Sequence, residues 1–495
     1  MDADSGKDSN RLPRRTFLTR AALMGMALAA GACAFPAAAP SGATVGATTT
    51  PSPPSTPAFR QVELTAATCW GAKFAQAAEQ AFAGCLRPEA GLSVRVQHIA
   101  AASFPATILT RLAGGDPFAL IFLAAQDVAS WVASGAALAL NDLVAKDRAS
   151  LLLADIGSKA LGQWLYGNDS PPPPEACDTC AEARGEWTMA GRLYGLPSLQ
   201  ASLHSYFNLD LFHEAGLQAP APTALWQWKQ LQQWGRALTA RQNGRTAQYG
   251  FAATGTQWCW EAWPNLNGAH IWDEALTRCL LDDPRAIEAL AFYQSLIYVD
   301  SVALPPGAAE ARASFAAGRV AILLDGSWQL GYLRDHSPLA GFDWDIGLPP
   351  VRAEGAAFFV PSFTAGALIP AAVRDVEASW AALQCQASQA FAVQLVAAGL
   401  AVIPVRQSAL RTAPFRSSPA VSPAGQTASF YTRLAELGAP RRSTRYDLGK
   451  EIIADLDQLQ MIYTNAAKPA DLLPALAQKI NRALTERPWN RTGEH

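Results

Sequence analysis

The hydrophobic pattern after residue 60 switches repeatedly between a period of two and a period of about 3.6. Segments that alternate apolar and polar positions, or that stay apolar over about six residues, predict strands. Segments with apolar residues three and four apart predict helices, because these spacings fall on one helix face. The predicted strands are 61–68, 92–99 and 118–123, and the predicted helices are 72–86, 104–113 and 127–134. This order predicts an α/β fold in which helices cover a parallel sheet.

Residues 191–217 predict a link between two bodies. Two short extended pieces follow one another, and Pro197 in the first piece lacks the amide hydrogen that a central strand needs. Asn208 or Asp210 is suited to cap the helix that follows, and Gly216 is suited to end it. Because 495 residues exceed what one hydrophobic core usually covers, we expect two lobes joined by this segment.

The second half of the chain continues the mixture of helices and short strands. The predicted helices are 223–240, 284–298, 311–317, 375–399, 443–455 and 470–484, and the predicted extended segments are 320–324, 341–350 and 365–369. The pattern shows no evident internal repeat.

The N-terminus has the features of an export signal. Arg14-Arg15 form a twin-arginine pattern, and the apolar run at 21–30 is too short to span a bilayer comfortably. Small residues then precede Cys33, as in a lipoprotein processing site. We expect residues 1–33 to be a signal peptide and Cys33 to be lipidated. The alternative is cleavage nearby that leaves Cys33 unmodified or removes it.

Residues 34–60 predict a disordered tether. Up to residue 57 they are almost entirely Ala, Pro, Ser, Thr and Gly, which cannot bury a core. No later stretch reaches the roughly 18 apolar residues of a transmembrane helix. A lipid followed by a loose tether places the folded body outside the cytoplasm, either in the periplasm or on the outer surface of the membrane.

Composition and charge argue against several classes of function. The net charge is −2 and no long basic run follows the N-terminus, so nothing favours nucleic acid as a partner. The sequence contains no GxSxG, HExxH or glycine-rich phosphate loop, so we expect neither enzyme activity nor a cofactor. A secreted carbohydrate-active enzyme is the less favoured alternative, and it would need paired acids such as Asp343 and Asp345. The 15 Trp residues suit a core, but they also offer flat faces for sugars.

The cysteines leave several pairings open. Residues 168–184 look like an insertion and hold a CxxC pair, Cys177 and Cys180. Since neither a second CxxC nor a helix start accompanies this pair, a local disulfide is favoured over a metal site or a redox function. The other candidate bridges are Cys69–Cys85 and Cys259–Cys279.

Four stretches in order resemble one known family. They are residues 109–117 with the later 133–138, residues 191–217, Pro222-Thr223 before Trp226, and residues 315–328 (FAAGRVAILLDGSW). Together they are similar to the extracellular solute-binding proteins of ABC importers, the maltose-binding-protein-like family, and the resemblance covers nearly everything after residue 61. The sequence departs from the family in having Ile322 where Met is usual, in its CxxC insertion and in a long C-terminal region.

The resemblance implies a two-lobe, periplasmic-binding-protein-like (type II) fold with a cleft between the lobes. It places crossings near Leu196-Pro197, near 318–320 and near 363–365. The first lobe would hold residues 61–197 and 320–362, and the second lobe residues 198–319 and 363–495. The family implies a monomer that captures a sugar or oligosaccharide and delivers it to the membrane permease of an ABC transporter. Glycerol-phosphate or another small polar solute is the alternative ligand.

The candidate ligand-binding residues are aromatic or carry amides near loop positions: Trp70, Gln126, Gln200, Trp258, Trp260, Asn267 and Trp328. Indole faces can stack on the apolar faces of a sugar, and amides can pair with its hydroxyls. Trp70 and Trp328 follow predicted strands, where ligand loops lie in open α/β sheets. Hinge packing is the alternative role for Trp328, and core packing is the alternative for Trp260. For a phosphate-bearing ligand, Arg406 is the candidate cation.

Overall fold

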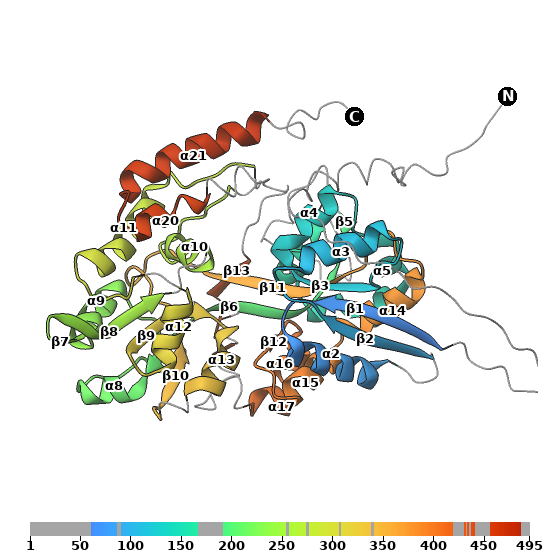
Figure 1. The fold of residues 1–495 in the computed structure, drawn as a ribbon, viewed down its shortest axis with the longest axis horizontal. Helices are drawn as coiled ribbons and strands as arrows, with labels where there is room; N and C mark the ends of the chain where they lie inside the picture. Colours follow the sequence, from blue (N-terminus) through green and yellow to red (C-terminus); the bar gives the residue numbers. More distant parts are fainter. Residues whose placement is uncertain are drawn as a thin grey trace, which may run out of the picture.

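The computed structural model describes residues 61–86, 91–166, 192–253, 257–273, 277–305, 308–337, 341–418, 430–431, 433–434, 437–440 and 456–486. These residues form two α/β bodies joined by long strands (Figure 1). The expected signal peptide, the tether, Cys33 and the CxxC pair lie outside the described residues, so these assignments stay predictions.

One mixed sheet runs through both bodies in the order β2-β1-β3-β11-β6-β9-β8-β7. Its main strands are β1 (Val62–Thr68), β2 (Leu92–His98), β3 (Leu120–Ala124), β6 (Leu196–Asn208), β7 (Ala240–Gln242), β8 (Arg245–Ala253), β9 (Val320–Gly326) and β11 (Val360–Leu368). The short strands are β4 (Leu165–Tyr166), β5 (Arg192–Leu193), β10 (Trp344–Gly347), β12 (Ile403–Pro404) and β13 (Gly438–Pro440). β1 pairs in parallel with both β2 and β3, which confirms the parallel sheet expected for the first segment.

Helices flank the strands of both bodies. In the first body they are α2 (Ala72–Cys85), α3 (Phe104–Ala113), α4 (Val128–Ala133), α5 (Asn141–Leu151), α6 (Ser158–Gly162), α14 (Val376–Gln386) and α15 (Gln389–Ala397). In the second they are α8 (Leu209–Glu214), α9 (Trp228–Ala237), α10 (Gln257–Asn265), α11 (Pro284–Tyr298), α12 (Ala308–Ala316), α13 (Gln329–His336), α20 (Gln460–Tyr463) and α21 (Pro469–Glu486). Two short helices, α16 (Gln407–Leu410) and α17 (Ala413–Arg416), follow β12.

The buried side chains show how the chain divides between the bodies. One core draws on residues 64–199 and 367–405, and another on residues 207–324 and 456–484. This differs from the expected division, in which residues 320–362 belonged to the first lobe and everything after 363 to the second. Strand pairing is the reason, because β9 pairs with β8 and with the end of β6, whereas the end of β11 pairs with β3.

The two bodies are joined by β6 and β11, which pair antiparallel from Ser202–Ser362 to Leu196–Ala367. The break expected at Pro197 does not occur, because β6 runs through this residue. Instead the register shifts between Ala365 and Gly366, opposite Pro197. One step on β11 there spans two steps on β6, so Ser198 is the extra residue and the bulge lies on β6 beside Pro197. A bulge is one of the few places where a strand tolerates proline.

Helix α8 begins and ends as its sequence predicts. The Asn208 side-chain oxygen accepts a hydrogen bond from the Leu211 amide at 3.1 Å, which makes Asn208 the N-cap. Gly216 has φ 66°, a left-handed conformation that glycine adopts without strain. These local signals position the helix directly after the crossing.

A disulfide joins Cys85 at the end of α2 to Cys385 near the end of α14, 300 residues later. The candidate bridges Cys69–Cys85 and Cys259–Cys279 are wrong, since Cys69 and Cys279 are free thiols. Burial raises the pKa of the Cys69 thiol and raises that of Cys279 to about 12, so both are weak nucleophiles. The observed bridge could not be found by proximity in sequence, because it connects the two separate segments of the first lobe.

Gly366 allows the two crossing strands to approach closely. A Cβ at this position would lie 2.1 Å from the Leu196 carbonyl oxygen and 2.7 Å from the Pro197 Cα. These are backbone atoms, so no flexible side chain can move aside. We expect Gly366→Ala to lower the free energy of unfolding by about 1–2 kcal/mol, measured by urea denaturation.

A glycine in α13 provides the matched control. A Cβ at Gly331 would lie an ordinary 3.8 Å from the Cβ of Ala401, so Gly331→Ala is expected to be neutral or slightly stabilising. If Gly366→Ala proved as stable as Gly331→Ala, the strands would not approach as closely as described.

No helix in the described ranges combines the length and the apolar character needed to cross a bilayer. Within the same ranges, no cluster of three or more His, Cys, Asp or Glu side chains could hold a metal ion.

Candidate functional site at the strand ends

Strands from both lobes end near the middle of the molecule and point toward one another. β3 ends opposite β11 at the Ala124–Ala365 pair, and β9 ends opposite β6 at the Gly326–Leu203 pair. Ala365 also pairs with Leu199, so these ends are separated along β6 by the four residue steps from 199 to 203, or roughly 13 Å. Ligands of open α/β sheets bind outside the carboxyl ends of strands. The region between the strand ends is therefore the candidate site.

Trp328 lies at this position on the second lobe. It lies two residues after the end of β9 and is the N-cap residue of α13, and 38% of it is exposed. Its indole covers Gly326, where a Cβ would lie 2.2 Å from the ring, so only glycine fits beneath it. The ring centroid lies 6.3 Å from that of Phe363 in β11. Trp328 thus lies on the face of the crossing strands β6 and β11 from which the Phe363 side chain projects.

Trp70 and Gln126 lie at the corresponding position on the first lobe. Trp70 follows β1 and packs edge-on against Phe74 and Phe122, with ring centroids 5.0 and 5.8 Å apart, so it is half-buried. Gln126 lies in η2 (Ala125–Asp127), the turn directly after β3, and is also half-buried. Both residues therefore follow strands that end at the candidate site.

One aromatic residue beside Gln126 was missed from the sequence. The Tyr166 hydroxyl donates to the carbonyl oxygen of Ala125 at 3.3 Å, which brings its ring next to the turn after β3. Tyr166 forms the two-residue strand β4 just before the insertion, and a short isolated strand carries little sequence signal. Phe363 was also missed as a contact, although its segment was expected to be a crossing.

Two other candidates lie in the second lobe. Trp258 and Trp260 are in α10, which follows the carboxyl end of β8, but their side chains lie outside the described residues. Asn267 is 3% exposed, and its amide donates to the Arg285 carbonyl at 2.8 Å and to Glu288 at 2.9 Å. The Asn267 amide group therefore joins the segment after α10 to the start of α11 within the second lobe.

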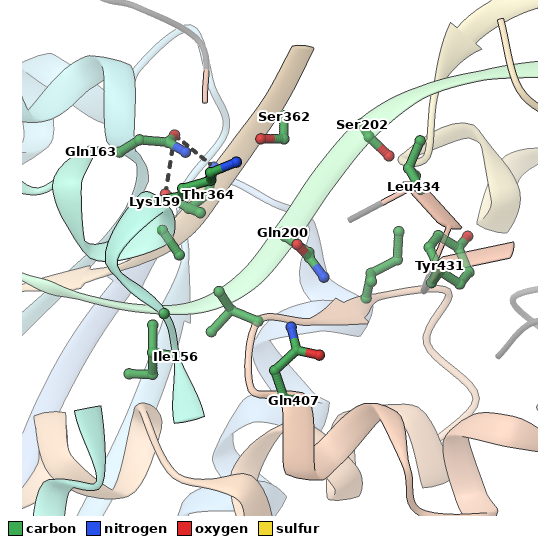
Figure 2. A pocket seen from close by; sticks show the side chains of 14 residues that line it. Ile156, Lys159, Gln163, Gln200, Ser202, Ser362, Thr364, Gln407, Tyr431 and Leu434 are labelled. Atoms are coloured by element: carbon green, nitrogen blue, oxygen red, sulfur yellow. Dashed lines mark hydrogen bonds between the residues drawn. The ribbon is translucent and has the colours of Figure 1, made fainter. Parts of the chain in front are cut away.

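Gln200 lies on the opposite face of the crossing strands from Trp328. Side chains alternate along a strand, so Gln200 and its partner Thr364 point away from the face of Phe363. The Gln200 amide donates to the Pro404 carbonyl at 3.0 Å. Gln200 also lines a cavity of about 190 Å³ that the structure places on this face, and neither Trp70 nor Trp328 lines it (Figure 2).

Uncharged polar groups dominate the surroundings of this cavity. Gln163 accepts hydrogen bonds from the backbone amide and the hydroxyl of Thr364 at 3.1 and 3.2 Å (Figure 2). The Ser202 hydroxyl lies 3.3 Å from Nε2 of His204, which is fully buried. Burial lowers the pKa of His204 to about 3, so its imidazole is neutral at physiological pH. Burial likewise raises the pKa of the Tyr431 phenol well above its ordinary value.

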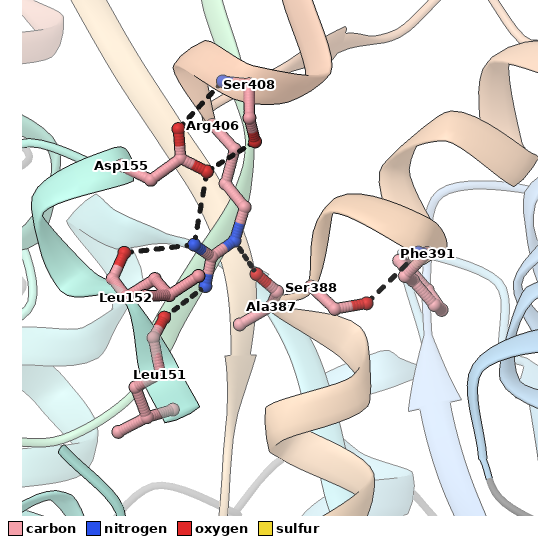
Figure 3. Close-up of polar contacts among 8 residues, drawn as sticks. All are labelled: Leu151, Leu152, Asp155, Ala387, Ser388, Phe391, Arg406 and Ser408. Carbon is pink, nitrogen blue, oxygen red and sulfur yellow. Dashed lines mark hydrogen bonds and ion pairs between the residues drawn. The ribbon is translucent and has the colours of Figure 1, made fainter. Parts of the chain in front are cut away.

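Arg406 is a structural residue and does not face a ligand. Its guanidinium donates to the carbonyl oxygens of Leu151, Leu152 and Ala387 and pairs with Asp155 at 3.3 Å (Figure 3). Asp155 in turn accepts from the amide and the hydroxyl of Ser408 (Figure 3). Desolvation lowers the Arg406 pKa, but this network of acceptors compensates the buried charge. The cation considered for a phosphate ligand is therefore already committed within the first lobe.

The acid pair considered for an enzyme lies away from the strand ends. Asp345 is in β10, opposite Phe207, and Asp343 accepts from the Leu209 amide through its backbone oxygen. These contacts are at the far end of β6 from Leu199 and Leu203. Burial raises the pKa of Asp345, but no strand end of the first lobe approaches it within the paired registers.

Two α/β lobes whose strand ends meet across two shared strands define a two-lobe binding protein of the periplasmic-binding-protein type. The chain matches the model of the bacterial extracellular solute-binding protein family over residues 71–390, and it belongs to that family. Comparison with curated protein sequences gave no match.

Solved structures with the same fold come from several bacteria. An ABC substrate-binding protein from Listeria monocytogenes, in complex with cycloalternan, has a TM-score of 0.68 at 18% identity, covering 86% of this chain and 99% of that one. The maltose/maltodextrin-binding domain MalE from Bdellovibrio bacteriovorus, bound to maltotriose, has a TM-score of 0.65 at 14% identity, covering 86% and 100%. A solute-binding protein from Agrobacterium radiobacter K84, in complex with ribitol, has a TM-score of 0.65 at 21% identity, covering 86% and 99%. These likenesses confirm the expected two-lobe fold.

Proposed function

We propose that this protein is the substrate-binding component of an ABC importer that captures a sugar or oligosaccharide outside the cytoplasmic membrane and delivers it to the permease. The observation that carries the proposal is the exposed indole of Trp328, which follows the carboxyl end of β9 in one lobe, where β9 points toward the carboxyl end of β3 in the other lobe. Membership of a solute-binding family supports it. Cycloalternan and maltotriose bound to proteins of the same fold give further support.

Trp328, Trp70 and Gln126 are the contacts we propose for this ligand. The apolar face of a pyranose ring can lie on an indole, and the Gln126 amide can both donate to and accept from hydroxyls. α10 follows the end of β8, which makes Trp258 and Trp260 the proposed contacts on that side. Because the groups belong to different lobes, a ligand between them favours the arrangement in which both lobes touch it.

The charge of the described residues favours a neutral ligand over an anionic one. Trp70, Gln126, Trp328 and Phe363 carry no cation, and Arg406 is engaged by carbonyl oxygens and Asp155. A phosphate group would call for Arg or Lys donors. We therefore rank glycerol-phosphate below a sugar, and we rank enzyme activity lower still.

The finer points of location and partners belong to the same proposal. A lipid on Cys33 and the tether at 34–60 would hold the carrier at the membrane surface, close to its permease. The carrier acts as a monomer, since one chain supplies both lobes.

A ligand panel tests the proposal. The purified mature protein is heated with maltose, maltotriose, cycloalternan, ribitol or glycerol-3-phosphate, and the added compound is then analysed chemically. We expect one of the sugars to raise the melting temperature, because a ligand at 100 times its Kd stabilises the folded state by about 2.7 kcal/mol. The sugar should be recovered unchanged. A response to glycerol-3-phosphate alone, or release of a product, would replace the proposal with one of its alternatives.

A further inference from the structure

The cavity on the back of the crossing strands is built from segments far apart in the sequence. Gln200 and Ser202 come from β6, and Ser362 and Thr364 from β11. The remaining lining comes from residues 156–163 around α6, from residues 403–407 and from residues 431–434. The first of these segments contributes to the first-lobe core, whereas Tyr431 and Leu434 belong to a different apolar cluster that includes α12 and α13. The cavity is thus enclosed by groups from both sides of the crossing.

The chemistry of the lining fits hydroxyl groups. Gln163, Gln200 and Gln407 supply carboxamides, and Ser202 and Ser362 supply hydroxyls, so the wall can both donate and accept (Figure 2). Ile and Val side chains between these groups can contact the carbon atoms of a guest. No carboxylate is found in the described lining, and its one ammonium, Lys159, is exposed.

A buried hydroxyl of the lining residue Tyr431 has no hydrogen-bond partner within the described part of the chain. Tyr431 is 2% exposed, and its phenol oxygen has no hydrogen-bond partner among the residues that the structure describes. The neighbouring His204, with a ring centroid 5.6 Å away, also has its Nδ1 atom unpaired within the same set. Buried polar groups are normally paired, so a guest hydroxyl that reaches past the Tyr431 ring would satisfy a group that the described residues leave without a partner.

The size of the cavity limits the guest. Its volume of about 190 Å³ is below the roughly 300 Å³ at which pockets for drug-sized ligands begin. This volume favours a guest smaller than a trisaccharide. A compact molecule with several hydroxyls and no net charge matches both the volume and the lining.

We propose that this cavity is a second binding site, for a small neutral polyol, separate from the transport site on the Trp328 face. A polyol there contacts both crossing strands and the groups on either side of them. Its binding stabilises the relative arrangement of these segments. If the polyol binds one arrangement of the two lobes more tightly, it changes the sugar affinity of the transport site by linkage.

The test uses calorimetry and thermal melting of the full mature protein with glycerol, erythritol, xylitol and myo-inositol. At least one polyol is expected to give saturable binding and to raise the melting temperature. Gln200→Leu should weaken that binding by at least about tenfold, because a polar wall group is replaced by an apolar one. Tyr431→Phe, which removes a single oxygen and keeps the ring, should weaken it about fivefold.

Trp328→Ala separates the two sites. Polyol binding should be unchanged in this variant, even if no transported sugar is ever found, so the inference stands apart from the proposed function. Loss of polyol binding in Trp328→Ala but not in Gln200→Leu would move the polyol to the transport site and overturn the proposal. No binding of any of the four polyols would also overturn it, since the cavity would then hold only water. Undiminished polyol binding in both Tyr431→Phe and Gln200→Leu would also overturn it, since the polyol would then bind elsewhere on the protein.

Discussion

Trp328→Ala is expected to weaken binding of the transported sugar by roughly 30- to 100-fold. A tryptophan side chain offers about 150–250 Å² for contact, and the 38% of Trp328 that is exposed leaves roughly 90 Å² for a ligand to cover. At about 25 cal/mol per Å² this area alone gives about 2 kcal/mol, and ring stacking adds to it. The measurement is isothermal titration calorimetry with the sugar that the panel identifies.

Two variants serve as controls for Trp328→Ala. Trp328→Phe keeps an aromatic face above Gly326 and should retain most of the affinity. Trp234→Phe removes an indole in the second-lobe core, where Trp234 stacks on Trp226 with centroids 5.4 Å apart, and should leave the Kd unchanged. If Trp328→Ala bound the sugar with the same Kd as the natural protein, Trp328 would have its alternative role, which is packing at the hinge.

Removing the Cys85–Cys385 disulfide is expected to be the most destabilising change considered. The bond closes a loop of 300 residues, for which the chain-entropy relation gives about 5–6 kcal/mol as an upper value. Losses of native disulfides are commonly about 2–5 kcal/mol, so we expect a loss of about 4 kcal/mol from the first lobe in Cys85→Ser/Cys385→Ser. Calorimetric melting measures it, and the two lobes can melt in separate transitions.

Reductant provides the internal comparison for the disulfide. It should lower the first-lobe melting temperature of the natural protein to that of Cys85→Ser/Cys385→Ser, and it should have little further effect on the double variant. Cys177→Ser/Cys180→Ser is the matched control, and its melting should remain sensitive to reductant. Equal melting of the oxidised and reduced natural protein would contradict a stabilising bridge at this place.

Local patterns predicted the elements of the first lobe closely. β1, β2 and β3 begin or end within two residues of the predicted strands, because period-two alternation and a fully apolar run are signals within the segment itself. Asn208 and Gly216 were predicted for the same reason, since capping depends on residues a few positions apart.

Properties that depend on distant partners could not be predicted in this way. The sequence of β9 does not show that this strand pairs with β6 and β8. Its segment was therefore placed in the first lobe, whereas the pairing places it in the second. Gln200 and Trp328 were placed in one site, although strand alternation puts Gln200 on the other face once its pairing with Thr364 is known. The Cys85–Cys385 bridge depends on the packing of α2 against α14, two helices nearly 300 residues apart.

A crystal structure with the best sugar from the panel tests the central claim most directly. The account predicts one sugar ring stacked on the indole of Trp328, between the ends of β3 and β9, with the first lobe contacting the same ligand through Gln126 or Trp70. A sugar held within one lobe only, or a ligand bound away from these strand ends, would contradict it.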